Sequence, residues 1–408
     1  MQKSTGAPQR LLLSAVIALL FLLITFWVVN WRISVGAEKA ALQQYEVLKQ
    51  WVFGYQKENT MSDSILQVDV HYDKQIVMEH NAEDAHLIRG KVAVTDRDKL
   101  LRLLLYLKKT NNYRYILLDV FFDPTVTQPS DSALFSLVSS MPRIVIPEPQ
   151  NPQKDSCLRA KMGFARYGTT VWEGDFVKYH YLIDDKRSLA LKMYEELTGN
   201  KISSFESLHF DGWRPVRSSA ILTYGLVEDE SLRDEHLYLG TSLVGDSIDS
   251  YEYQSLIQNP DFAKDRYVLI GDFEDDVHNT FMGKMSGCII NFNAFLFLQN
   301  GHHRISFWMM LLLFLSFWWL VNLTLSHSEF AGMFMWFGYP FYLLIICLFT
   351  YEIFHEVFDL LAATILLYAL QNIIQCLRNK DGIVRWKDII ILKMEKIWKK
   401  VALLRSRF

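Results

Sequence analysis

YRYILLDVFF, at residues 113–122, is the stretch of sequence that says most about the fold. Its hydrophobicity is almost continuous, whereas a strand with one face in water alternates between apolar and polar residues. Continuous strands of this kind are typical of a parallel sheet that is covered on both faces. Asp119 interrupts the apolar run at a point where burial of a lone charge is costly, so we single it out as a candidate functional residue.

Short apolar runs recur on both sides of this strand, and segments with helical patterning separate them. The other expected strands are Ile65–Val70, Arg143–Ile146 and Tyr267–Gly271. The expected helices are Asp98–Lys109, Ser130–Ser140, Ser188–Leu197 and Gly287–Leu298, with Thr95 or Asp96 as the cap of the first. This alternation predicts an α/β fold with a mostly parallel sheet covered by helices. Residues 200–262 do not fit the alternation, and we expect extra strands or an insertion there.

Four stretches are long and apolar enough to cross a membrane, which takes about 20 residues as a helix. They are Leu11–Val29, Ile305–Leu325, Phe330–Thr350 and Val357–Cys376. A cleavable signal peptide is the alternative for the first stretch, but no A-x-A-like cleavage site follows it. We therefore predict four transmembrane helices, one before the α/β domain and three after it.

The distribution of charge predicts the orientation. Residues 1–30 contain Lys3 and Arg10 and no acid, residues 305–376 contain no Lys or Arg, and residues 377–408 contain ten basic residues. Because basic residues stay on the cytoplasmic side, both termini are expected there. The predicted division is a cytoplasmic N-terminus at 1–10, a transmembrane helix at 11–30, an extracytoplasmic domain at 31–304, three transmembrane helices at 305–376 and a cytoplasmic segment at 377–408.

The cytoplasmic segment predicts a basic amphipathic helix over 383–404. A helix of this composition is expected to lie on the anionic inner leaflet, with a cytoplasmic protein partner as the alternative. The residues that we expect at the membrane surface are Trp386, Lys393, Lys396, Trp398, Lys399 and Lys400.

Several motifs together are similar to those of one family. They are VDVHYDKQ (68–75), TDRDKLLRLLLYLKK (95–109) with Arg97 in the place of the family's characteristic arginine, YILLDVFFDP (115–124), and RYVLIGDFEDDVHNTFMGKMSGCIINFNAFLFLQNG (266–301). In this order, and with one span before and three after, the chain resembles the type-two CHASE domain, an extracytoplasmic sensor module of bacterial signalling proteins. The resemblance covers roughly residues 35–376. It departs from the family's turns at GKVAVT (90–95) and WEGDFVKY (172–179).

The resemblance implies a multi-pass protein of the bacterial plasma (inner) membrane, with its main domain periplasmic or extracellular. Family members often carry a kinase or cyclase after the last span, whereas 32 residues follow Cys376 in this sequence. We therefore expect a sensor that reports through another protein.

Acidic residues cluster where ligands bind in open α/β sheets, which is outside the carboxyl ends of the strands. The candidate ligand-binding residues are Asp69, Asp119, Asp123, Asp272, Asp275 and Asp276. Carboxylates gathered there could hold a hard cation such as Ca²⁺ or Mg²⁺, or a polar ligand. The alternative is that each aspartate caps a following helix or turn.

Common catalytic motifs are absent from the sequence, including G-x-G-x-x-G, the phosphate-binding loop, H-E-x-x-H and G-x-S-x-G. His302 and His303 are expected at the membrane surface and not as metal ligands. We therefore expect no enzymatic activity, no cofactor and no catalytic residue.

Three functions compete on this basis. The first is a sensory or signalling membrane protein without its own catalytic output, the second a structural or assembly component of an envelope complex, and the third a metal-assisted hydrolase that uses the acidic loops. The expected partners are the lipid bilayer and a protein in the membrane or cytoplasm, with a homodimer left open and no nucleic acid.

Overall fold

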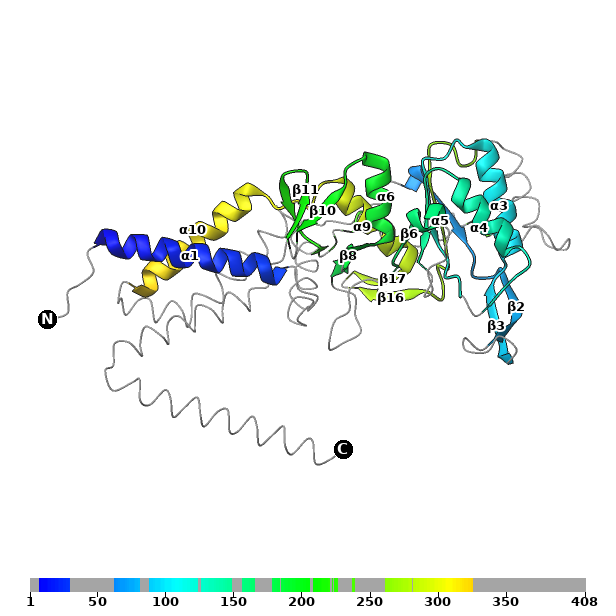
Figure 1. Ribbon diagram of the computed structural model, residues 1–408, viewed down its shortest axis with the longest axis horizontal. Helices are drawn as coiled ribbons and strands as arrows, with labels where there is room; N and C mark the ends of the chain where they lie inside the picture. The colour runs from blue at the N-terminus through cyan, green and yellow to red at the C-terminus, as the bar shows by residue number, and fades with distance from the viewer. Residues whose placement is uncertain are drawn as a thin grey trace, which may run out of the picture. The chain divides into compact units, whose positions relative to one another are not determined.

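Figure 1 shows the protein as a computed structural model, which describes residues 7–29, 62–80, 88–123, 126–148, 156–165, 178–183, 185–205, 208–220, 222, 224–226, 237–238, 261–280 and 282–325. The chain divides into two compact units. One contains the long apolar helices α1 (Ala7–Val29) and α10 (Phe307–Leu325), and the other contains the α/β domain, which runs up to Ile305.

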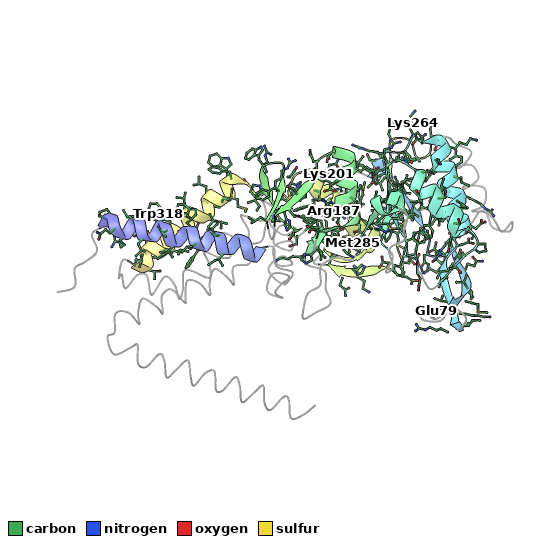
Figure 2. All side chains as sticks on the ribbon, viewed as in Figure 1. Glu79, Arg187, Lys201, Lys264, Met285 and Trp318 are labelled. Carbon is green, nitrogen blue, oxygen red and sulfur yellow. The ribbon has the colours of Figure 1, made fainter. Side chains whose placement is uncertain are left out.

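In the helical unit, α1 and α10 pack against each other. The rings of Phe21 and Phe317 meet edge to face with their centroids 6.0 Å apart. Trp318, labelled in Figure 2, donates its indole N–H to the carbonyl oxygen of Leu11 at 3.2 Å. By length and composition both helices could cross a membrane, and they coincide with the spans expected at 11–29 and 305–325. The spans expected at 330–350 and 357–376, and the amphipathic helix at 383–404, lie outside the described residues.

The α/β domain is built on a six-stranded sheet in which every pairing is parallel. In spatial order the strands are β14 (Leu237–Tyr238), β1 (Ile65–Asp69), β15 (Tyr267–Gly271), β4 (Tyr115–Asp119), β5 (Ile144–Pro147) and β6 (Met162–Gly163). The expected parallel sheet is therefore confirmed. The strand expected over 113–122 is shorter than predicted, because β4 ends at Asp119.

Helices cover the sheet on both of its faces. One face packs on α3 (Arg97–Thr110) and α4 (Asp131–Ser140), through a core that includes Val68, Leu104, Leu118, Leu134 and Ile270. The other face packs on α6 (Leu189–Thr198) and α9 (Gly287–Gln299). On that second face the Tyr267 ring contacts the rings of Phe292 and Phe295. The short helix α5 (Ser156–Ala160) packs on α4.

Two helices of the domain, α3 and α6, begin where a short polar side chain caps them. Asp96 accepts hydrogen bonds from the backbone N–H groups of Asp98 and Lys99, which are among the donors left unpaired at the start of α3. Ser188 caps α6 in the same way through the N–H of Leu191. The backbone at Gly199 turns left-handed and ends α6, a conformation that glycine adopts without steric cost. These helices confirm the ones predicted at 98–109 and 188–197.

Several small antiparallel elements are added to the parallel sheet. The hairpin of β2 (Lys74–His80) and β3 (Ile88–Thr95) follows β1, and the segment GKVAVT, at which the chain departs from the family's turn, lies within β3. The three-stranded sheet of β10 (Ile202–Phe205), β11 (Leu208–Asp211) and β12 (Arg214–Val216) supplies the extra strands expected within 200–262. The remaining strand pairs are β7 (Tyr179–His180) with β13 (Ser219–Ala220), β8 (Leu182–Ile183) with β9 (Lys186–Arg187), and β16 (Val277–Thr280) with β17 (Gly283–Ser286). A 3-10 turn, η1 (Ser62–Ser64), precedes β1.

Candidate functional site

The carboxyl ends of the three central strands lie side by side. Asp69 at the end of β1 pairs in register with Gly271 of β15, and Gly271 pairs with Asp119 of β4. The turns that leave these strands therefore begin at one edge of the sheet, the position at which open α/β sheets bind ligands. This arrangement brings the turn after β1 against the loop after β15.

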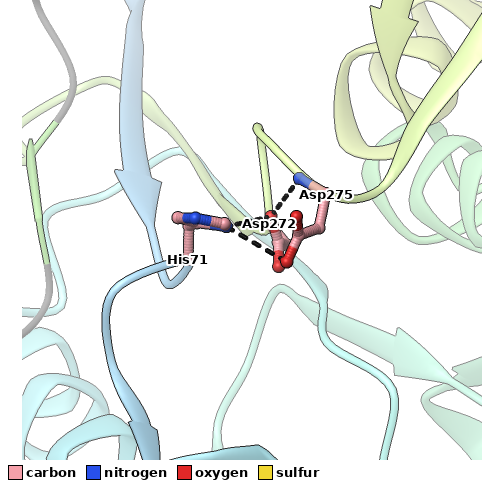
Figure 3. A group of neighbouring side chains, drawn as sticks. All are labelled: His71, Asp272 and Asp275. Carbon is pink, nitrogen blue, oxygen red and sulfur yellow. Dashed lines mark hydrogen bonds and ion pairs between the residues drawn. The ribbon is translucent and has the colours of Figure 1, made fainter.

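Four side chains from these two segments form a group that we call the edge cluster: His71, Lys74, Asp272 and Asp275. Nδ1 of His71 lies 3.3 Å from Asp272 Oδ1 and 3.3 Å from Asp275 Oδ2. The ammonium group of Lys74 lies 2.7 Å from Asp272 Oδ2 and 2.9 Å from Asp275 Oδ2. Figure 3 shows His71 facing the two aspartates across the edge. The cluster joins residues from β1–β2 to residues that lie about two hundred positions later.

The turn after β15 positions Asp272 locally. Its Oδ1 accepts hydrogen bonds from the backbone N–H groups of Asp275 at 2.8 Å and Glu274 at 3.2 Å, as in the turns that aspartate typically begins. Burial raises the pKa of the Asp272 carboxyl, but the Lys74 ammonium and these backbone donors outweigh it and lower the pKa below its usual value. Asp272 is thus held in its charged form at the edge.

Asp69 lies beneath the edge cluster and connects its two segments. The side chain is fully buried, and its Oδ1 accepts from the backbone N–H of His71 at 2.9 Å and of Phe273 at 3.3 Å. Burial raises the pKa of Asp69, the two backbone donors oppose this, and the charges of Asp272 and Glu274 add to the increase. Asp69 therefore holds the two turns together.

Asp119 belongs to a second polar network on the α9 side of the sheet. Its Oδ2 accepts from the side-chain amide of Asn291 at 2.8 Å, and the oxygen of that amide accepts from the hydroxyl of Tyr179 at 2.7 Å. Asn291 is fully buried in α9, although the rest of that helix is almost entirely apolar. Asp119 does not interrupt an apolar strand, as the sequence suggested, because it is the last residue of β4 and is only half-buried.

The remaining two candidates lie apart from the edge cluster. Asp276 contacts Nε2 of His278 at 3.1 Å, and this hydrogen bond is the main reason that the pKa of His278 is raised. Asp123 lies in the segment after β4, where its backbone carbonyl accepts from the buried guanidinium of Arg97 at 3.5 Å. Arg97 forms its ion pair with Asp131 at 2.5 Å. The structure therefore brings Asp272 and Asp275 together above Asp69, and separates the other three carboxylates.

His71 and Lys74 are site residues that the sequence analysis missed. The available signal was their place in HYDK, directly after β1, at the same carboxyl end that singled out the aspartates. Tyr72 and Glu274 border the cluster, with the Tyr72 hydroxyl 3.1 Å from Glu274 Oε2. These four residues lie in the motifs that resemble the CHASE family.

Ligand atoms of His71, Asp272 and Asp275 lie within 4.8 Å of one another, so this set could hold a metal ion. One imidazole and two carboxylates suit a divalent cation of moderate hardness. The Lys74 ammonium bonds the same two carboxylates, and a cation would have to displace it. The arrangement also suits a polar ligand whose own charged groups would replace Lys74 or the aspartates as ion-pair partners.

His303, expected at the membrane surface, is instead buried inside the α/β domain, and this prediction was wrong. Its Nε2 lies 3.4 Å from Asp211 Oδ2, and its ring meets the Tyr194 ring edge to face at 5.1 Å. The expectation failed because the strand β12 extends the domain up to Ile305, through a hydrogen bond from the Ile305 N–H to the carbonyl of Pro215. The domain therefore reaches almost to the first residue of α10.

A parallel sheet covered by helices, with charged residues at its carboxyl edge, defines an α/β domain that is joined in sequence to two long apolar helices. The model of the CHASE2 domain family matches residues 21–326, and the chain belongs to that family. The predicted CHASE resemblance is thereby confirmed. No curated protein and no solved structure matches the chain.

Proposed function

We propose that this protein is a membrane-anchored sensor whose CHASE2 domain binds its ligand at the edge cluster and passes the signal through its helices to a protein partner. Support for a sensory role comes from the family, since the CHASE2 domain is an extracytoplasmic sensor domain. Support for membrane attachment comes from α1 and α10, which are long and apolar enough to span a bilayer.

The observation that carries the proposal is the construction of the edge cluster. Its ion pairs join the turn after β1 to the loop after β15, and Asp272 and Asp275 come from the loop that leads through β16 and β17 into α9. A ligand that replaces Lys74 or His71 would alter the contacts of this loop. Because α9 is followed by α10 in sequence, a change in this loop would reach the helical unit through α9.

The first experiment is a pull-down of the full-length tagged chain from native membranes in a mild detergent, with quantitative mass spectrometry. We expect one or a few proteins to co-purify, and their amount to change for Lys74→Ala but not for Lys91→Ala. Lys91 is an exposed residue of β3 in the same hairpin and serves as the matched control. Recovery of the chain alone, under conditions that preserve other membrane complexes, would contradict the proposed relay.

The same experiment addresses the structural alternative. A component of an envelope complex should retain its partners at fixed stoichiometry whether or not the edge cluster is altered. A sensor should hold its partners in a manner that depends on the cluster.

The proposal assigns no catalytic reaction to the acidic residues. Metal-assisted hydrolysis would require a turnover that Asp119→Asn and Asp276→Asn abolish. For ligand binding, the first probes are Mg²⁺ and Ca²⁺ as chloride salts, added to the full chain in lipid nanodiscs while its thermal unfolding is followed. A rise in Tm that Asp272→Asn removes would identify the edge as a cation site, and no rise would direct the search to polar organic ligands.

A further inference from the structure

The strand β12 pairs with the residues that lead into α10. The N–H of Arg217 donates to the carbonyl of His303 at 3.2 Å, and the N–H of Ile305 donates to the carbonyl of Pro215 at 3.0 Å. Val216 and Arg304 form an antiparallel bridge between these two hydrogen bonds. The side chains of Asp211 and Arg304 fix the same pairing, with Arg304 Nη2 2.7 Å from Asp211 Oδ2.

The antiparallel register sets the direction in which the turn between β11 and β12 points. Residues earlier in β12 lie beside residues later in the segment that approaches α10. The direction from Val216 back to Trp213 is therefore the direction in which the chain runs from Arg304 to Ile305. The helix α10 begins two residues after Ile305. The β11–β12 turn is thus directed the way the chain leaves the domain.

The tip of this turn exposes an aromatic ring. Trp213 is 82% exposed, more than any other large apolar side chain among the described residues. Gly212 turns the backbone with a φ of +64°, a left-handed conformation that side chains rarely adopt. The Arg214 guanidinium lies over the Trp213 ring at 5.5 Å from its centroid. The indole is thus held at the tip of the turn, where an outside surface can reach it.

The charges at the tip are basic. Ile202 pairs with Asp211, so Lys201, labelled in Figure 2, comes at the same end of the three-stranded sheet. Lys201 and Arg214 are both exposed. The acid nearest to them in the sheet, Asp211, is held by Arg304. An indole flanked by two cations has the chemistry of the membrane–water interface, where tryptophan lies at the level of the headgroups and basic side chains meet anionic phosphates.

We propose that the β11–β12 turn rests on the outer surface of the bilayer, with Trp213 among the headgroups and Arg214 and Lys201 against lipid phosphates. This inference rests on the membrane anchoring proposed above. Trp213 is two residues from Pro215, and Ile305 is two residues from Phe307, which is about 7 Å of extended chain in each case. Within the domain, the turn is therefore tied through Pro215 to Ile305, two residues before α10 begins.

The experiment compares nitroxide labels at two ends of the same strand pair in the full chain. Leu208, at the start of β11, is 55% exposed and lies three residues from Asp211, which makes it the matched control. Trp213→Cys and Leu208→Cys are made with Cys157, Cys347 and Cys376 replaced by Ser, while the buried Cys288 is kept. The chain is placed in nanodiscs of zwitterionic and anionic phospholipids, and the accessibility of each label to oxygen and to a water-soluble nickel chelate is measured.

We expect the label at Trp213 to be reached by oxygen more than by the nickel chelate, and the label at Leu208 to show the opposite preference. The native side chain is tested separately with brominated lipids. Brominated lipids should quench part of the tryptophan fluorescence of the wild-type chain. In Trp213→Phe that quenched part should be missing.

Three results would overturn the inference. If Trp213 is as open to the nickel chelate as Leu208, the turn lies in water. If neither reagent reaches it, a protein covers it, which is either a second copy or a partner. If the chain does not enter nanodiscs at all, the proposed membrane anchoring fails first, so the two failures are distinguishable.

Discussion

Lys74 Nζ lies 2.7 Å from Asp272 Oδ2, so this ion pair joins the start of β2 to a residue 198 positions later in the chain. The same ammonium is 2.9 Å from Asp275. Lys74 places one positive charge between two carboxylates that are brought together at the carboxyl edge of the sheet. If the edge binds a ligand, Lys74 must be among the groups that the ligand displaces or contacts.

Replacement of Lys74 by Met should therefore destabilise the domain. The pair is partly exposed, so we expect a loss of about 1 kcal/mol or less in the free energy of unfolding at neutral pH. The folded-state pKa of Asp272 lies below its ordinary 3.8, so its stabilisation is present above pH 3.8 and is lost as the pH falls through the folded pKa. The difference between wild type and variant should shrink in that acid range. Chemical denaturation at several pH values measures it.

The control for this prediction is Lys91→Met, at an exposed position of β3. It should leave the free energy of unfolding unchanged. An equal loss in both variants would show that the charge of Lys74 has no specific partner in solution.

Gly271 allows α9 to approach the end of β15. A Cβ added there would lie 3.0 Å from Cβ and 3.3 Å from Sγ of Cys288, at the start of α9. We expect Gly271→Ala to cost about 1–3 kcal/mol, as overpacking of a filled core typically does. Cys288→Ala in the same chain should recover part of the loss, because it removes the Sγ contact and leaves the closer Cβ contact. Thermal unfolding of the two single variants and the double variant measures this coupling.

Gly90→Ala is the matched control, because a Cβ at Gly90 meets nothing within 4 Å. The prediction fails if Gly271→Ala is tolerated as well as Gly90→Ala.

The sequence predicted the elements that carry a strong local signal. β15 is a continuous apolar run and was predicted with its observed bounds, Tyr267–Gly271. The caps of α3 and α6 follow from Asp96 and Ser188, whose side chains accept from the first free backbone N–H groups. By contrast, the hairpin of β2 and β3 mixes polar and exposed apolar residues, and it has no buried face to produce a recognisable period.

The site was predictable only in part, because it depends on pairing between distant segments. Carboxyl ends of strands could be recognised from the chain, and Asp272 and Asp275 were candidates for that reason. That β15 lies between β1 and β4 is set by the tertiary fold, and only this order places His71 against the loop after β15. The same order puts Asp119 on the α9 side, with Asn291 as its partner.

Arg97 is the buried charge on which the segment after β4 depends. Its guanidinium pairs with Asp131 at 2.5 Å and donates to the carbonyl of Val126 at 3.1 Å, while its side chain is only 4% exposed. Arg97→Met would leave the carboxylate of Asp131 without this cation in a site that is largely closed to water. We expect a loss of about 3–5 kcal/mol, the usual effect of breaking a buried ion pair from one side. Chemical denaturation measures it.

A matched comparison is available on the same helix. Arg102 pairs with Asp98 one turn away, and both side chains are more than half exposed. Arg102→Met should cost at most a few tenths of a kcal/mol, as exposed pairs of this spacing do. Similar losses at Arg97 and Arg102 would contradict the role assigned to Arg97.

His303 should make the domain sensitive to mild acid. Burial lowers the pKa of His303 to about 4, the charges of Arg304 and Arg217 add to this, and Asp211 opposes it. Since the unfolded chain takes up the proton first, the stabilisation is complete above pH 6.5 and is lost as the pH falls toward 4. The full effect is on the order of 3 kcal/mol, from 1.4 kcal/mol for each pH unit of the shift.

His303→Phe keeps an aromatic ring against Tyr194 and removes the titrating group, so it should flatten the dependence of unfolding free energy on pH between 6.5 and 4. His278 is the control with the opposite sign. Its folded-state pKa is raised, chiefly by the hydrogen bond to Asp276, so it stabilises the fold in acid and loses that effect as the pH rises through the folded pKa. The His278 contribution therefore changes only above pH 6.5, so His278→Gln should leave the slope between 6.5 and 4 unchanged and should remove a decrease in stability above pH 6.5. If the slope of His303→Phe equals that of wild type, the acid sensitivity arises from another group, and the imidazole at the junction with α10 is not the one that titrates.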